Sequence, residues 1–301
     1  MTDISILFPG QGSQSIGMGN AWKNTPSWKI AQEAHEIIGI DFDELLTQEN
    51  DLLQKTEFAQ LAILVNSLIA YSEIIKTPKF EDSQVKYFAG HSLGQITALI
   101  AAGTFSFEEG LKFAKKRAEE TQKCANENNG AMAAFIGGTT EDALNLCEQF
   151  SNLYVANDNC LGQIVLAGDA SDVEKAVEIA KESGFKLAKQ IPVDGAFHTP
   201  HMAKASTALG TYLESATLNH SEIPVISNDD AIPYTDSSIW IDKLPLHVES
   251  PVLWTQTMDL LSSTNQLNYE IGSGKILFGL SKRHKPEIKV TPITQLEDLE
   301  S

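Results

Sequence analysis

The sequence is poor in cysteine, and it has no long uninterrupted apolar run. Only three cysteines occur among 301 residues, and their spacing fits neither a disulfide framework nor a set of metal ligands. We therefore expect a reduced, cytoplasmic protein with no bound metal and, from its N-terminal residues, no signal peptide. The longest apolar stretch, residues 61–75, is interrupted by Asn66, Ser67 and Glu73, which makes it too short and too polar to span a bilayer.

Basic residues are also scarce: 22 Lys and Arg stand against 40 Asp and Glu, for a formal net charge of −18. Binding to nucleic acids or to anionic membranes requires clustered cations, so this balance argues against a broad surface of either kind. The basic residues that do occur are concentrated near the end of the chain, at Lys275, Lys282, Arg283, Lys285 and Lys289. Such a local patch predicts contact with an anionic partner at one place.

The most informative feature that is present is the sequence GHSLG at residues 90–94. It follows residues 85–89, which predict a strand, and precedes residues 95–102, which predict a helix. Between a strand and a helix, Gly-x-Ser-x-Gly is typical of a nucleophile elbow that exposes the serine hydroxyl at the top of a sheet. The amide of Leu93 would then lie at a helix N-terminus and could stabilise an oxyanion. The alternative is a serine that only caps the helix after a glycine turn.

A serine nucleophile needs a base, and His198 and His201 are the candidates. Both lie in a loop that leaves a predicted strand, where catalytic groups are commonly presented. Position alone does not choose between them. Asp194 is close enough in sequence to orient His198, although it could equally be a turn residue. A backbone carbonyl could fix the histidine tautomer instead.

The first predicted strand, residues 4–8, leads into a glycine-rich loop at residues 9–14. The loop lacks the third glycine of the dinucleotide-binding pattern and the Gly-Lys-Ser/Thr ending of a P-loop, so nucleotide binding is not expected. We expect the loop instead to bring a backbone amide close to Ser92 as a second oxyanion donor. Gln11 and Gln14 would then be positioned polar groups.

Arg117 lies on the helix predicted to follow the elbow helix. An arginine fork can bind a carboxylate through two parallel hydrogen bonds. The neighbouring Lys115 and Lys116 favour the alternative, in which all three residues form a solvated basic face.

The apolar pattern predicts an α/β protein: an α/β-hydrolase-like large domain with a mainly parallel central sheet, plus an inserted smaller domain. The expected boundaries are residues 1–127 and 197–301 for the large domain and residues 128–196 for the small one. The small domain shows the order β-α-β-β-α-β of a ferredoxin-like α+β module, and it would lie over the site. Its expected elements are strands at 131–136, 153–156, 163–167 and 185–193 and helices at 140–150 and 171–183, with a turn that includes residues 157–159.

Outside that module, the large domain is expected to be helical at 20–80, 95–126 (with a break at 104–107), 202–216 and 251–261. Two further strands are expected in it, at 224–227 and 269–271.

Taken together, these motifs resemble those of the malonyl-CoA:acyl-carrier-protein transacylases of fatty acid synthesis and the related acyltransferase domains of polyketide synthases. The resemblance covers nearly the whole chain, from Phe8 to Arg283. It rests on residues 8–14, residues 90–94, Arg117 followed by residues 130–133, Ala196-Phe197-His198, residues 251–254 and residues 270–274.

The resemblance implies that Ser92 attacks the malonyl thioester of coenzyme A. It selects His198 over His201 as general base and then general acid. The amides of Gln11 and Leu93 would form the oxyanion hole. The malonyl group would then pass to the phosphopantetheine thiol of an acyl carrier protein by a ping-pong route.

For the substrate, the resemblance implies that Arg117 pairs with the free malonyl carboxylate, with Gln11 and His91 beside it. Three positions depart from the family pattern: Gln95, where many relatives have Glu; His247, where many have a Gln whose segment orients the histidine; and Ser273, where Pro is usual. His247 could still serve if the orienting atom is its backbone carbonyl.

The resemblance implies no cofactor beyond the two substrates, malonyl-CoA and phosphopantetheinylated acyl carrier protein, and we expect a monomer. Because acyl carrier proteins are acidic, the basic residues Lys275, Lys282, Arg283 and Lys285 are a candidate docking patch. The alternatives are an acyltransferase serving a polyketide synthase, a hydrolase of acyl-carrier thioesters and a non-catalytic carrier-binding protein. Arg117 weighs against the hydrolase, and intact Ser92 and His198 weigh against the binding protein.

Overall fold

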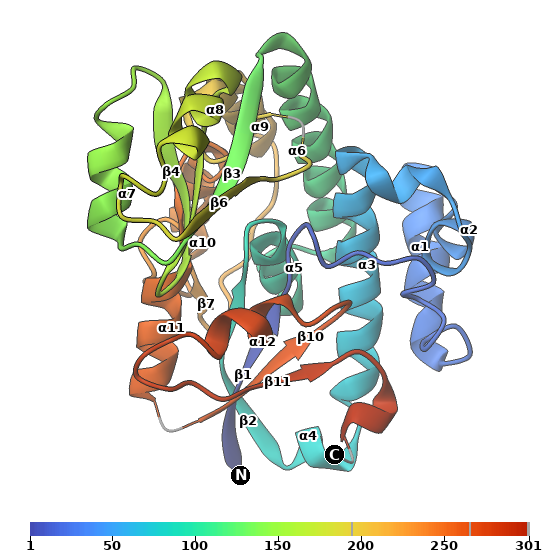
Figure 1. Cartoon of the computed structure of the whole chain (residues 1–301). Coiled ribbons are helices and arrows are strands. Elements are labelled where there is room, and N and C mark those ends of the chain that lie inside the picture. The colour runs from blue at the N-terminus through green and yellow to red at the C-terminus, as the bar shows by residue number, and fades with distance from the viewer. Residues whose placement is uncertain (194, 265, 300–301) are drawn as a thin grey trace.

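The computed structural model describes residues 1–193, 195–264 and 266–299, and it contains two sheets (Figure 1). In the larger sheet the strand order is β11-β10-β1-β2-β7-β8, and all neighbours are parallel except β7 and β8. This confirms the predicted α/β class. The strands are β1 (Thr2–Phe8), β2 (Ser83–Gly90), β7 (Val225–Ile226), β8 (Pro233–Tyr234), β10 (Leu267–Ile271) and β11 (Val290–Ile293).

The smaller sheet has the order β6-β3-β5-β4-β9. Its first four strands and two helices follow the expected order β-α-β-β-α-β: β3 (Gly130–Ile136), α7 (Thr140–Cys147), β4 (Leu153–Cys160), β5 (Gln163–Asp169), α8 (Ala170–Glu178) and β6 (Leu187–Gln190). The fifth strand, β9 (Val252–Leu253), comes from later in the chain and pairs in parallel with β4. The domain boundaries at residues 127 and 197 therefore stay a prediction, because the smaller sheet also takes in this later strand.

Helices cover both sheets. Figure 1 shows α7 and α8 on the outer side of the smaller sheet, and α1 and α2 at the opposite edge of the molecule beyond α3. The remaining helices are α1 (Lys29–Ile38), α2 (Phe42–Thr47), α3 (Thr56–Ile74), α4 (Pro78–Glu81), α5 (Leu93–Ala101), α6 (Phe107–Glu127), α9 (Ala203–Leu213), α10 (Ser237–Leu246), α11 (Trp254–Ser263) and α12 (Ile276–Ser281).

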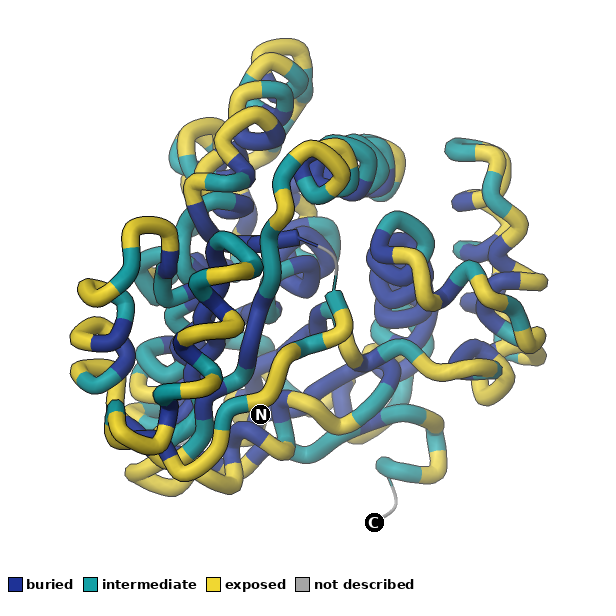
Figure 2. Tube along the Cα trace, turned by 45° about the horizontal axis from the view of Figure 1, so that its top comes forward, coloured by how far each residue is buried: buried dark blue, intermediate teal, exposed yellow. Residues whose placement is uncertain are grey.

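The core is built from a central strand and a helix that are apolar on all sides. The last five residues of β1 are buried, as expected for a parallel strand covered on both faces. Most of α3 is buried as well, which fits its lack of a polar face. Figure 2 shows buried segments running through the middle of the molecule and exposed ones at its periphery. Within the described residues, no helix is long and apolar enough to cross a membrane.

Local signals in the sequence explain where several helices begin. Thr139 and Asp142 form a capping box at the start of α7, in which each side chain binds the backbone amide of the other. Ser106 caps α6 by accepting a hydrogen bond from the amide of Glu109, after the expected break between α5 and α6. The caps at Thr139 and Ser106 thus set where α7 and α6 begin.

The expected turn at residues 157–159 is wrong, because these residues belong to β4 and the turn lies at residues 161–162. Polar residues are tolerated in this strand because their side chains have partners. Asp158 accepts hydrogen bonds from Thr255 (2.5 Å) and Thr140 (3.2 Å). Asn159 accepts one from His91 (2.8 Å). A buried polar group that is hydrogen-bonded avoids most of the cost of leaving water.

The helix expected at 251–261 also differs, since Val252 and Leu253 first pair with β4 and the helix begins only at Trp254. Three further elements, α10, β8 and β11, were not expected from the sequence. β8 and β11 are short, and α10 carries Pro245 in its last turn, which obscures the helical pattern.

Candidate active site

Ser92 lies in a sharp turn between the end of β2 and the start of α5, with φ of 51° and ψ of −109°. Both flanking glycines are required by close backbone packing. A Cβ on Gly90 would lie 1.9 Å from the backbone of Gly94, and one on Gly94 would lie 2.1 Å from the carbonyl oxygen of Phe8. The Ser92 side chain makes no helix-capping hydrogen bond. The capping alternative is therefore wrong, and the turn has the geometry of a nucleophile elbow.

The hydroxyl of Ser92 faces a single histidine. Its Oγ lies 2.9 Å from Nε2 of His198. The other ring nitrogen of His198, Nδ1, lies 2.9 Å from the carbonyl oxygen of His247 and 3.1 Å from that of Ser250. Because both of these partners are acceptors, Nδ1 carries the proton and Nε2 presents its lone pair to the serine.

The other candidate base, His201, is engaged elsewhere: its Nε2 lies 2.9 Å from Oδ1 of Asp169. The structure thus brings His198, and not His201, to Ser92. Asp194, the weak candidate for orienting His198, lies outside the described residues.

Arg117 is the buried cation of the site, with only 2% of its surface exposed. It donates one hydrogen bond from Nη2 to Oγ of Ser92 (3.1 Å) and another from Nη1 to Oε1 of Gln60. The alternative of a solvated basic face is therefore wrong for Arg117. Lys115 and Lys116 do lie on the accessible side of α6, where they pair with acidic residues one turn along the helix.

The charge of Arg117 has no acidic counterpart. Among the described residues, no carboxylate lies within ion-pair distance of its guanidinium, and its Nε has no hydrogen-bond partner. Burial lowers the pKa of Arg117 to about 10, so it still carries a full positive charge at neutral pH.

The imidazoles near this cation are neutral. Burial, followed by the positive charge of Arg117, lowers the pKa of His198 to about 3. The same two causes place the pKa of His247 well below its ordinary value, and burial lowers the pKa of His91. The site therefore combines an unprotonated base with one uncompensated positive charge.

Two backbone amides are available beside the serine. A Cβ on Gly10 would lie 2.4 Å from the carbonyl oxygen of His91, so the loop at residues 9–14 packs directly against the elbow. In the part of the chain that the structure describes, the amides of Gln11 and Leu93 donate to no protein acceptor. The Gln11 side chain donates to Oγ1 of Thr56 (3.2 Å). Leu93 is the first residue of α5, where free amides favour an anion.

Several site residues were missed by the sequence analysis. Gln60 holds Arg117, Asn159 holds His91, and Ser250 supplies a carbonyl to His198. Asn228 accepts a hydrogen bond from the amide of Ser92 (2.8 Å). A signal for Asn228 was present: it follows β7, and the carboxyl ends of parallel strands are where sites form in open α/β sheets.

The departures from the family pattern have structural roles. Oε1 of Gln95 accepts a hydrogen bond from the amide of Asn228 (2.7 Å), a role that a carboxylate oxygen could also fill. The carbonyl oxygen of His247 accepts a hydrogen bond from Nδ1 of His198 (2.9 Å). Oγ of Ser273 lies 3.4 Å from Oγ of Ser13, beside the glycine-rich loop. All three act through contacts with residues around Ser92 rather than at its hydroxyl.

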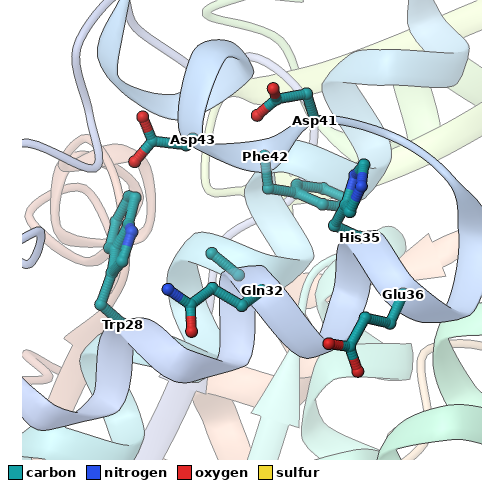
Figure 3. A pocket seen from close by; sticks show the side chains of 8 residues that line it. Trp28, Gln32, His35, Glu36, Asp41, Phe42 and Asp43 are labelled. Atoms are coloured by element: carbon teal, nitrogen blue, oxygen red, sulfur yellow. The ribbon is translucent and has the colours of Figure 1, made fainter.

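A separate cavity of about 410 Å³ lies between α1 and α2, and none of its lining residues belongs to the Ser92 site. Figure 3 shows Trp28 on one side and Phe42 with His35 on the other, while the carboxylates of Asp41 and Asp43 stand at the rim. Asp43 pairs with Lys23 at 3.0 Å, outside the cavity lining. No serine, threonine or cysteine lines this cavity, so it offers no hydroxyl or thiol nucleophile.

A serine with a neutral histidine and two free amides can carry out acyl transfer through a covalent intermediate. Comparison with known proteins supports this chemistry, because residues 6–248 match the acyl transferase domain family. The chain belongs to the acyl transferase family. A malonyl CoA-acyl carrier protein transacylase of Bacillus subtilis is 34% identical to this acyltransferase over 100% of this chain and 96% of the relative.

Solved acyltransferase structures agree. The acyl carrier protein S-malonyltransferase of Vibrio cholerae superposes with a TM-score of 0.93 at 31% identity, covering 99% of this chain and 98% of that one. A malonyl-transacylase in complex with its type II polyketide-synthase acyl-carrier protein gives a TM-score of 0.93 at 27% identity, with the same coverage. The resemblance to malonyl-CoA:acyl-carrier-protein transacylases, and the fold that it implies, are thereby confirmed.

The low pKa of His198 has a measurable consequence for the reactivity of Ser92. The neutral imidazole is the form that accepts a proton, and with a pKa of about 3 it persists from pH 8 down to pH 5. We predict that the rate of Ser92 labelling by a fluorophosphonate, a reagent for activated serines, changes less than about twofold over this range. A Ser92→Ala variant supplies the background. A loss of half the rate near pH 6.5, as for an ordinary histidine, would contradict the prediction.

Proposed function

We propose that this acyltransferase moves the malonyl group from malonyl-CoA to the phosphopantetheine thiol of an acyl carrier protein, in fatty acid synthesis. The observation that carries the proposal is Arg117: a buried cation with no acidic partner among the described residues, hydrogen-bonded to the nucleophile itself. An acyl group with a free carboxylate at its far end supplies the missing charge while its thioester reaches Ser92. His91, the residue directly before Ser92, and Gln11 would lie beside the bound acyl group.

In the proposed first half-reaction, Oγ of Ser92 attacks the thioester carbonyl carbon and its proton passes to Nε2 of His198. The amides of Gln11 and Leu93 stabilise the oxyanion that forms. When this intermediate collapses, the C–S bond breaks and His198 returns the proton to the departing thiolate of coenzyme A. The product is a malonyl ester on Ser92.

The second half-reaction runs the same steps with the carrier thiol as the attacking group. His198 removes its proton, a new thioester forms, the C–O bond to Ser92 breaks, and His198 returns the proton to Oγ of Ser92. The carbonyl oxygens of His247 and Ser250 would keep the imidazole in the required tautomer during both halves. All of these groups come from the chain itself, so we propose a reaction without a cofactor or a metal, carried out by a monomer.

The proposed setting is the cytoplasm, in line with the free thiols of Cys124, Cys147 and Cys160. A second candidate is the same transfer in a polyketide pathway, because one of the similar structures is a complex from such a system. The chemistry at Ser92 would be identical, and the carrier protein would differ.

Intact mass spectrometry tests the proposed function directly. After mixing with malonyl-CoA, the protein should gain one malonyl group, which Ser92→Ala should not. Added phosphopantetheinylated acyl carrier protein should then remove the group and become malonylated. Loss of the group to water alone would indicate a hydrolase, and the absence of any gain in a folded protein would mean that malonyl-CoA is not the substrate.

Arg117 should set the preference for malonyl over acetyl groups. A charge-assisted hydrogen bond contributes about 1.5–3 kcal/mol, or roughly tenfold to a hundredfold. We predict that Arg117→Ala lowers the ratio of kcat/KM for malonyl-CoA to that for acetyl-CoA by this factor. Using the ratio cancels the loss of the contact between Arg117 and the Ser92 hydroxyl, which affects both substrates. An unchanged ratio would remove Arg117 from substrate recognition.

We propose that the carrier protein docks on the basic patch formed by Lys275, Lys282, Arg283 and Lys285. All four side chains are exposed, and within the described ranges none of them is in an ion pair. Arg283 reaches the smaller sheet through a hydrogen bond to Gln163 (2.6 Å), so the patch spans the two sheets. An acidic carrier would find complementary charge there.

The double variant Lys282→Glu/Lys285→Glu should raise KM for acyl carrier protein about fivefold to tenfold, since each exposed charge pair is worth up to about 1 kcal/mol. Transfer to free pantetheine, which lacks the protein surface, should not change. Lys29→Glu, an exposed lysine on α1, is the matched control. Equal effects on both acceptors, or an equal effect of the control, would exclude the patch.

A further inference from the structure

Beyond the groups that react, we infer that Asn228 is a positioning residue that holds Ser92 in fixed relation to His247, the residue that orients His198. The inference rests on the proposed function only in that acyl transfer requires the pair of Ser92 and His198. Asn228 follows β7 in sequence and is 1% exposed. Among the described residues, its side chain hydrogen-bonds to the Ser92 amide, Gly90 and His247 and not to the serine hydroxyl or the imidazole of His198, so it acts through the groups that hold them.

The side-chain amide of Asn228 bridges the backbone on either side of His91. Its Oδ1 accepts a hydrogen bond from the amide of Ser92 (2.8 Å), and its Nδ2 donates to the carbonyl oxygen of Gly90 (2.8 Å). These two hydrogen bonds fix the orientation of the Asn228 side-chain amide, because the backbone N–H of Ser92 is a donor and the carbonyl oxygen of Gly90 is an acceptor. The bridge restrains the turn in which Ser92 has its positive φ.

Oδ1 of Asn228 also contacts His247, the residue that orients the base His198. Nε2 of His247 lies 3.1 Å from Oδ1 of Asn228, and the carbonyl oxygen of His247 lies 2.9 Å from Nδ1 of His198. Since Oδ1 is an acceptor, Nε2 of His247 carries the proton. One amide thus connects the backbone of the nucleophile to the residue that orients the base.

Asn228 is itself held at both of its backbone groups. Its amide donates to Oε1 of Gln95 (2.7 Å), and its carbonyl oxygen accepts from the amide of Leu253 (2.7 Å). These bonds tie it to the elbow helix α5 and to the strand that joins the smaller sheet. The bridge also extends the pairing of β2 with β7, which in the backbone is limited to Phe88 and Val225.

Asn228→Asp tests this directly, because it keeps the shape of the side chain and replaces only the hydrogen-bond donor Nδ2 by an oxygen. An ionised aspartate at this position would present an oxygen to the carbonyl of Gly90, where a donor is needed. A protonated one would restore the donor, and burial against a carbonyl favours that protonated form. His247 contacts the amide, and the electrostatic neighbours of His247 are Arg117, His198 and His91. The positive charge of Arg117 favours the ionised carboxylate and so acts against burial. Asp229 and Asp230 both pair with Lys243.

We therefore expect Asn228→Asp to be active at pH 5 and to lose activity as the pH rises to 8. Two rates should be measured from pH 5 to pH 8: labelling of Ser92 by a fluorophosphonate, and kcat and KM for transfer from malonyl-CoA to pantetheine. At pH 5 both rates should lie within about threefold of the unaltered protein. At pH 8 the labelling rate and kcat should be lower by about tenfold or more, with KM little changed because Gln60 still holds Arg117.

Asn228→Ala should lose the same activity at every pH, because it can never restore the donor. The control is Asn24→Asp, which makes the same substitution at an exposed position and should behave like the unaltered protein. If Asn228→Asp unfolds at pH 8, its labelling at pH 5 compared with that of Asn228→Ala still decides the question. Positioning requires the Asp variant to be at least about threefold faster.

Two results would overturn the inference. One is a pH profile of Asn228→Asp that runs parallel to that of the unaltered protein. The other is equal labelling of the Asp and Ala variants at pH 5. Because fluorophosphonate labelling needs no malonyl group, either result is distinguishable from a failure of the proposed function, which would leave labelling intact and abolish only transfer.

Discussion

The close approach of three backbone segments around Gly90 and Gly94 is the constraint on which the site depends. The end of β1, the end of β2 and the start of α5 meet with no room for a Cβ at either glycine. This crowding forces the turn at Ser92 into a positive φ, which normally costs of the order of 1–3 kcal/mol for a residue other than glycine. Packing of the parallel sheet offsets this cost. The turn makes the serine hydroxyl project from the backbone, with the free amide of Leu93 beside it.

The electrostatics of the site follow from burial. Removing ionisable groups from water disfavours their charged forms, and for a histidine this means a neutral ring at neutral pH. Arg117 resists the same effect because its pKa starts far above neutrality and remains at about 10. The result is a site in which His198 is unprotonated at neutral pH beside the positive charge of Arg117. The proposed selectivity for an anionic acyl group and the neutral state of the base would therefore both follow from the same desolvation.

Much of the fold and part of the site could be predicted from sequence. A physical reason separates the features that could be predicted from those that could not. The elbow and the order of the smaller sheet depend on neighbours along the chain: strand, glycine, serine, helix and cap. The burial of Arg117 does not, because it depends on Gln60 from another helix, and the adjacent lysines give the opposite local signal. The same holds for residues 157–159, whose polar side chains look like a turn until Thr255 and His91 are brought to them by the fold.

The smaller sheet contacts several of the residues that hold the elbow in place. Its strand β4 binds the elbow through Asn159 and His91, and it binds the start of α11 through Asp158 and Thr255. Its pairing with β9 adjoins the contact between Leu253 and Asn228. A displacement of this sheet would therefore strain two supports of Ser92 at once. The position of the smaller sheet therefore contributes to the geometry around Ser92.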